Sequence, residues 1–187
     1  MKVLVACERS GTVRDAFIAR GHDALSCDIQ PTASPGPHYC GDVFDLIDYP
    51  FDLIIAHPPC THTSVSGAKH FAAKWSDGRQ ACGVAFFMRL WRAAEGHIAR
   101  ACFEHPVSIM SRLFRKPDQI IQPWQFGHGE TKATCLWLRA CPPPAADACR
   151  RRARGARASH AAIAGTCKRA QQNLRRHCAS DGRAVGH

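Results

Sequence analysis

One stretch of the sequence, FDLIIAHPPCTHTSVSG (residues 51–67), limits most strongly what this chain can fold into. Its first six residues are almost entirely apolar, which is typical of a short strand covered on both faces. The two prolines that follow His57 fix two φ angles and prevent further strand pairing. Cys60 is therefore predicted just beyond the carboxyl end of a buried strand, at the edge where open α/β sheets bind their ligands.

Strand and helix patterns alternate along residues 1–144. Strands are predicted at residues 2–7, 23–28, 51–56, 97–106 and 133–138, and helices at residues 12–20, 78–95 and 107–114. Residues 30–40 and 61–77 predict loops, and residues 41–47 a short helical turn. This alternation predicts an α/β fold, with a single domain built on a mostly parallel sheet.

The basic charge of the chain is concentrated in its last part. Residues 1–144 carry 15 Lys or Arg and 13 Asp or Glu, whereas residues 145–187 carry 10 and 2. The formal net charge of +10 therefore does not make the body of the protein a nucleic-acid binder. We interpret residues 145–187 as an irregular basic tail, because the sequence there becomes rich in Arg and Ala without a hydrophobic period.

Composition argues against several classes of protein. The chain has no apolar stretch of about 18 residues and no signal-peptide core, so we expect a cytoplasmic protein without a membrane helix. The 11 cysteines form no Cys-x-x-Cys pair. The spacing of His57, Cys60, His62 and His70 fits no usual metal site, so we expect no metal.

Acidic residues accompany the predicted strands in a fixed order. Glu8 and Gly11 follow the first strand, Asp28 ends the second, Asp42 precedes the third, and Glu104 lies near the end of the fourth. Rossmann-like proteins hold ribose hydroxyls with an acid at the end of the second strand, and a glycine such as Gly11 lets the turn approach a ligand. The dinucleotide pattern G-x-G-x-x-G is absent. Because neighbouring parallel strands end at one edge, we expect Glu104 to approach Cys60.

The Pro-Pro-Cys that ends at Cys60, with Glu104 one strand later, resembles the catalytic centre of 5-methylcytosine DNA methyltransferases. In that family a Pro-Cys supplies the nucleophile and a Glu-Asn follows the next strand. Glu104 matches this pattern, whereas His105 replaces the asparagine. The segment FGHGETKATCLWL (126–138) is similar to small phage- and prophage-borne proteins of this type. The resemblance covers most of residues 1–144 and includes no separate target-recognition domain.

The resemblance implies a Rossmann-like methyltransferase domain over residues 1–144 that uses S-adenosyl-L-methionine as cofactor and DNA as substrate. Cys60 would attack C6 of a flipped cytosine, and Glu104 would contact N3 and the exocyclic amine of the ring. The cofactor site would be formed by Glu8, Gly11, Asp28, Asp42 and Pro58, with Asp42 near the adenine ring. S-adenosylmethionine has no phosphate, so a glycine-rich phosphate loop is not required.

Two alternative interpretations fit the same residues. The missing recognition domain and His105 favour a decayed protein that binds DNA or the cofactor without turnover. The other alternative keeps the fold but places the chemistry at an exocyclic amine of the base. His57-Pro-Pro would then take the place of the acidic or amide residue of the amino-methyltransferases.

The tail leads to a prediction about the gene, because its composition is typical of GC-rich DNA read in another frame. Residues 170–187 can be encoded by synonymous codons whose +1 frame reads RSRTYAGIAQAMAEQWG, with Ile, Met and Trp at helix-like spacing. That segment resembles the closing helix of the phage-type relatives. We therefore expect the sequenced gene to carry an open +1 frame with this segment after about residue 144. Stop codons in that frame would instead favour the alternative, a disordered basic tail that contacts DNA through Arg175, Arg176 and their neighbours.

Overall fold

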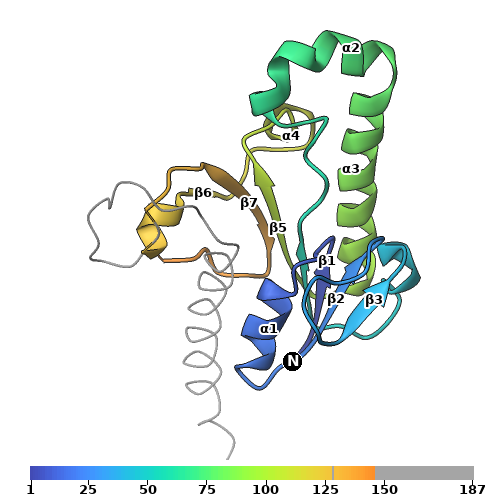
Figure 1. Ribbon diagram of the computed structural model, residues 1–187, viewed down its shortest axis with the longest axis vertical. Coiled ribbons are helices and arrows are strands. Elements are labelled where there is room, and N and C mark those ends of the chain that lie inside the picture. The colour runs from blue at the N-terminus through green and yellow to red at the C-terminus, as the bar shows by residue number, and fades with distance from the viewer. Residues whose placement is uncertain (128, 146–187) are drawn as a thin grey trace, which may run out of the picture.

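The computed structural model describes residues 1–127 and 129–145. This part of the chain forms an α/β unit around a seven-stranded sheet, shown in Figure 1. The strands lie in the order β3-β2-β1-β4-β5-β7-β6. They are β1 (Lys2–Ala6), β2 (Asp23–Asp28), β3 (His38–Cys40), β4 (Leu53–Ala56), β5 (Arg100–Pro106), β6 (Gln119–Ile121) and β7 (Thr134–Arg139).

Most neighbouring strands run parallel. β1 pairs in parallel with β2 on one side and with β4 on the other, and β2–β3 and β4–β5 are also parallel pairs. β7 is the exception, because it runs antiparallel to both β5 and β6. The predicted mostly parallel sheet is thus confirmed. The strand order reverses between β1 and β4, and such a switch point is where open α/β sheets form their ligand crevice.

Helices pack against the sheet and extend from one of its edges. They are α1 (Thr12–Ile18), α2 (Phe71–Ser76), α3 (Arg79–His97) and α4 (Met110–Leu113), with short 3₁₀ helices at Val43–Asp45, Val65–His70 and Pro123–Phe126. The Asp77 carboxylate accepts a hydrogen bond from the backbone N–H of Arg79, which caps the start of α3. In Figure 1, α3 runs beside the sheet and continues past the strand ends to meet α2.

The central strands are covered on both faces, as their apolar sequences predicted. On one face, Leu4 and Ile54 belong to a buried cluster that includes Phe87 of α3. On the other face, Val5 and Ile55 belong to a second buried cluster that includes residues of α1. Alternate residues of one strand therefore pack under helices on opposite sides of the sheet.

Three elements, β3, α2 and β6, lie where the sequence predicted either a loop or no regular element. β3 lies within residues 30–40, and α2 lies within residues 61–77. β6 occupies three residues for which no element was predicted. Strands of this length have too few residues to show a period of two, and each forms an edge of the sheet. α2 has little hydrophobic pattern because most of its side chains are exposed.

None of the described helices is long and apolar enough to cross a membrane. The basic tail predicted for residues 145–187, and with it the proposed change of reading frame, lies outside the described residues apart from Ala145.

Candidate active site

The carboxyl ends of β1, β2 and β4 surround two cavities. The first cavity has a volume of about 350 Å³ and is lined by Cys7, Glu8, Arg9, Ser10, Val13, Asp28, Ala33 and His57. The second cavity has a volume of about 290 Å³ and is lined by Cys7, Cys27, Asp28, Ile29, Gln30, Gly41, Asp42, Val43, Pro59 and Phe86. Because Cys7 and Asp28 line both cavities, the two meet at the switch point of the sheet.

Acidic side chains line both cavities, and Arg9 adds a positive charge to the first. Burial, followed by the negative charge of Asp28 and smaller effects that include Asp42, raises the pKa of Cys7 to about 12. Burial and the same acids also raise the pKa of Cys27 to about 12. Both thiols therefore stay protonated at neutral pH and are poor nucleophiles. The acids of the second cavity favour a ligand group that carries positive charge.

Asp28 and Asp42 each use one carboxylate oxygen in a hydrogen bond within the fold. The Asp28 Oδ1 atom accepts a hydrogen bond from the Gln30 backbone N–H at 2.9 Å, and Asp42 Oδ1 accepts one from the Phe44 N–H at 3.1 Å. Among the described residues, the second oxygen of each has no partner. Two of the three acids predicted for the cofactor site, Asp28 and Asp42, therefore line a cavity with a free acceptor.

Ile29 lines the second cavity and was not predicted as a site residue. Its side chain is 80% exposed, although a large apolar residue directly after a strand is usually covered. The signal in the sequence was an isolated isoleucine next to the strand-end acid Asp28. Its position offers an apolar surface for a flat ring.

Glu8 lines the first cavity, but its carboxylate is already engaged in the fold. Oε1 accepts hydrogen bonds from the Val13 backbone N–H at 2.6 Å and from the Ser10 hydroxyl at 3.1 Å. Oε2 accepts one from the Arg14 backbone N–H at 3.2 Å. Glu8 therefore satisfies backbone donors in the first turn of α1, where negative charge is favourable.

Gly11 lines neither cavity and instead leaves space for a buried arginine. A Cβ atom at Gly11 would lie 2.4 Å from Arg14 Nη2, and one at Gly36 would lie 2.6 Å from the same atom. The Arg14 side chain is completely buried. It donates from Nη2 to the Pro35 carbonyl at 2.9 Å and from Nη1 to the Ser26 hydroxyl at 3.2 Å. The guanidinium thereby fixes the proline-rich loop that borders the cavities.

Cys60 lies in a tight turn after β4 and is half-buried. Its carbonyl accepts hydrogen bonds from the backbone N–H groups of Thr63 at 3.1 Å and Ser64 at 2.9 Å. Cys60 lines neither cavity. Pro58, predicted for the cofactor site, is buried and also lines neither cavity, whereas the adjacent Pro59 lines the second.

Residues 60–65, the cysteine loop, are fastened to the segment that follows Glu104. The Val65 N–H donates to the Val107 carbonyl at 3.0 Å, and the Ile109 N–H donates to the Thr63 carbonyl at 3.1 Å. From the other side, Lys74 of α2 donates to the Thr61 carbonyl at 2.6 Å. These backbone contacts fix the path of the cysteine loop.

His105, which replaces the asparagine of the resembled family, also connects the cysteine loop to the segment after Glu104. Its Nε2 atom lies 3.2 Å from the Thr63 hydroxyl and its Nδ1 atom 3.1 Å from the Ser108 hydroxyl. The ring is 1% exposed. Burial lowers the pKa of His105, and contacts with the Pro106 carbonyl and with Glu104 oppose that effect only in part. His105 is thus a buried connection between the cysteine loop and the end of β5.

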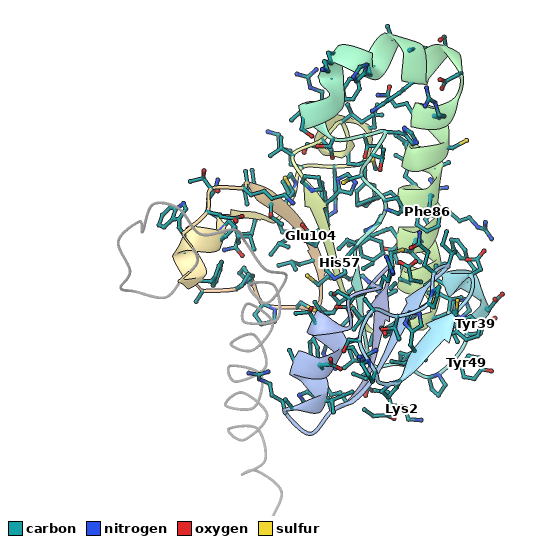
Figure 2. All side chains as sticks on the ribbon, viewed as in Figure 1. Lys2, Tyr39, Tyr49, His57, Phe86 and Glu104 are labelled. Carbon is teal, nitrogen blue, oxygen red and sulfur yellow. The ribbon has the colours of Figure 1, made fainter. Side chains whose placement is uncertain are left out.

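Glu104 pairs with His57 across the β4–β5 ladder. The register places Ala56 opposite Phe103, so His57 and Glu104, which follow them, lie opposite each other. His57 Nδ1 lies 3.1 Å from Glu104 Oε2, and the two side chains are 14% and 16% exposed; both are labelled in Figure 2. Burial acts to raise the pKa of Glu104, but the hydrogen bond from His57 and the nearby basic groups together outweigh it, and the pKa lies below its ordinary value. Glu104 is therefore a carboxylate at neutral pH.

Comparison with known proteins supports the fold. No protein-family model matches the sequence, and no curated protein matches it. The structure is similar to that of a protein described as a candidate DNA modification methyltransferase encoded within an E. coli prophage. The TM-score is 0.51 and the sequence identity 16%, and the match covers 74% of this chain and 46% of that chain. The chain thus spans less than half of that protein's length, and the likeness confirms the Rossmann-like α/β fold.

The buried His105 leads to a prediction about pH. Because its pKa is lower in the folded protein than the ordinary value of 6.5, the unfolded chain takes up the proton first as the pH falls. Stability should therefore decrease as the pH drops below about 6.5. His105→Asn removes this titration, so its midpoint of thermal unfolding should fall less than that of the wild type between about pH 7.5 and pH 5.5. His70→Asn, at an exposed position, is the control; equal slopes for wild type and His105→Asn would contradict the assignment.

Proposed function

We propose that this chain is an S-adenosylmethionine-dependent DNA methyltransferase that acts on C5 of cytosine through a covalent adduct with Cys60. The observation that carries the proposal is the backbone hydrogen bonding between the cysteine loop and the segment directly after Glu104. It fixes a half-buried thiol and a carboxylate on adjacent strand ends, next to two acid-lined cavities. DNA is the substrate that the Pro-Pro-Cys and Glu pattern implies.

The residues of the two cavities fit S-adenosylmethionine. Asp28 offers a free oxygen to ribose hydroxyls where the cavities meet, and Asp42 offers one to the amino group of adenine in the second cavity. Ile29 and Phe86 supply apolar surface for the ring. The acids of the cavities complement the sulfonium and ammonium charges of the cofactor. When bound, the cofactor supplies an activated methyl group.

Cys60 and Glu104 then have distinct roles. The Cys60 thiolate forms a bond to C6 of the flipped cytosine, which places electron density on C5. After methyl transfer, loss of the C5 proton restores the C5–C6 double bond and breaks the S–C6 bond, which frees the thiolate. Because Glu104 is ionised, it accepts a hydrogen bond from the exocyclic amine; a contact with N3 requires a proton on one of the two groups.

Methylation of an exocyclic amine is the second candidate, and one observation favours it. His57 lines the first cavity, whereas Cys60 lines neither. In this reaction the residue before Pro-Pro would accept a hydrogen bond from the target amine, and Cys60 would have no covalent role. Mass analysis of the nucleosides in treated DNA distinguishes 5-methylcytosine from N4-methylcytosine and N6-methyladenine.

A substitution at Asp28 tests the cofactor site. Asp28→Ala removes a hydrogen-bond acceptor from both cavities, and we expect binding of S-adenosylhomocysteine to weaken by about 1–3 kcal/mol, the cost of leaving a buried partner unpaired. Calorimetric titration measures the change. Asp23→Ala, at the exposed opposite end of β2, is the matched control and should bind as the wild type does. Unchanged affinity in a folded Asp28→Ala protein would remove this residue from the site.

A substitution at Cys60 tests the nucleophile. Cys60→Ser keeps the shape of the side chain but replaces a good nucleophile by a poor one, so turnover should be lost while cofactor affinity stays within about twofold. DNA that contains 5-fluorocytosine should trap the wild type covalently. Fluorine replaces the C5 proton and cannot leave in its place, so the bond between Cys60 and C6 is not broken. Cys82→Ser, on an exposed position of α3, should retain both turnover and trapping. Activity of Cys60→Ser, or an active wild type that forms no adduct, would contradict the role.

A further inference from the structure

One residue, His57, both lines the first cavity and contacts the carboxylate of Glu104. His57 Nδ1 lies 3.1 Å from Glu104 Oε2, and the same residue is among those that line the first cavity, with Cys7, Ser10 and Asp28. In Figure 2 the labelled side chains of His57 and Glu104 lie next to each other near the middle of the molecule. Glu104 itself lines neither cavity. Any effect of a ligand in the first cavity on Glu104 can therefore pass through His57.

The contact with Glu104 determines where the proton of the ring lies. A carboxylate oxygen can only accept a hydrogen bond, so His57 Nδ1 must be the donor. In the neutral ring, Nε2 then carries a lone pair and is an acceptor. The pKa of Glu104 lies below its ordinary value, so the carboxylate is ionised at neutral pH and accepts the hydrogen bond from Nδ1.

The Nε2 atom of His57 has no hydrogen-bond partner among the described residues, although it is buried. A buried acceptor without a partner is unfavourable, so a ligand that donates a hydrogen bond gains from meeting it. The first cavity is also lined by two acids, Glu8 and Asp28, and by one base, Arg9, so its charges suit a ligand end that carries both an ammonium and a carboxylate group. The amino-acid end of S-adenosylmethionine carries both groups, and its ammonium group is a hydrogen-bond donor.

We propose that His57 Nε2 accepts a hydrogen bond from this ammonium group, and that occupancy of the first cavity and the state of Glu104 are thereby coupled through the two nitrogens of one ring. This inference rests on the cofactor of the proposed function. It makes His57 a binding residue for the cofactor and a positioning residue for Glu104. The coupling is reciprocal, so a change at Glu104 must alter the affinity for the cofactor.

Two substitutions at His57 separate its two contacts. Asparagine places an amide nitrogen near the position of Nδ1, so His57→Asn can keep the bond to Glu104 but has no group at the position of Nε2. Glutamine places its amide near the position of Nε2, so His57→Gln can offer an acceptor to the cavity. In calorimetric titrations with S-adenosylhomocysteine, which retains the ammonium group, we expect affinity to fall about tenfold in His57→Asn. We expect it to fall less than about threefold in His57→Gln.

Glu104→Gln provides the test of coupling. The glutamine amide can donate to Nδ1, which moves the ring proton to Nε2 and removes the acceptor from the cavity. We expect this substitution to weaken S-adenosylhomocysteine binding severalfold when His57 is present and to have no further effect in His57→Asn. His70→Asn, on an exposed helix outside both cavities, is the matched control. Equal effects of Glu104→Gln in the two backgrounds would overturn the proposal.

Nitrogen NMR of the wild-type protein gives a measurement that needs no variant. The His57 ring should carry its proton on Nδ1, and the Nε2 resonance should move when S-adenosylhomocysteine saturates the protein. An unchanged Nε2 resonance at saturation overturns the coupling while leaving the cofactor assignment intact. No binding of S-adenosylhomocysteine or S-adenosylmethionine at millimolar concentration overturns the cofactor assignment and the coupling together.

Discussion

The parallel pairing of β4 with β5 is the constraint on which the rest of the site depends. Its register places Ala56 opposite Phe103, so His57 meets Glu104 at the point where both strands end. The pairing also brings the two following segments together, and the cysteine loop is then fastened to residues 105–109 by backbone hydrogen bonds. A shift of this register by one residue would place His57 and Glu104 on opposite faces of the sheet.

The central part of the fold could be predicted from the sequence because its signals are strong and local. The five strands with apolar runs were predicted near their observed positions, and the acids at Asp28 and Asp42 were placed at the cavity walls. The edge strands β3 and β6 could not be predicted, since three residues show no period and their pairing comes from the neighbouring strand. The antiparallel direction of β7 is likewise a property of the sheet and not of its own residues.

The details of the site depended on contacts that no spacing reveals. Glu8 and Gly11 were predicted to serve a ligand, but the structure gives Glu8 the backbone donors of α1 and gives Gly11 the space for Arg14. The turn after β4 places Pro59, and not Pro58, on the wall of the second cavity. His57 was considered with other histidines, but its pairing follows from register alone. Short motifs thus predict which edge of the sheet carries the cavities better than they predict the contacts of each side chain.

The buried guanidinium of Arg14 also has an evolutionary consequence. It satisfies carbonyl groups of a proline-rich loop, which has few N–H groups with which to form its own structure, and it occupies volume that a Cβ atom at Gly11 or Gly36 would need. Loss of the arginine would leave the loop without its main anchor, while gain of a side chain at either glycine would displace the arginine. The effects of substitutions at these three positions therefore depend on one another, although the positions are separated in the sequence and none of them needs to touch a ligand.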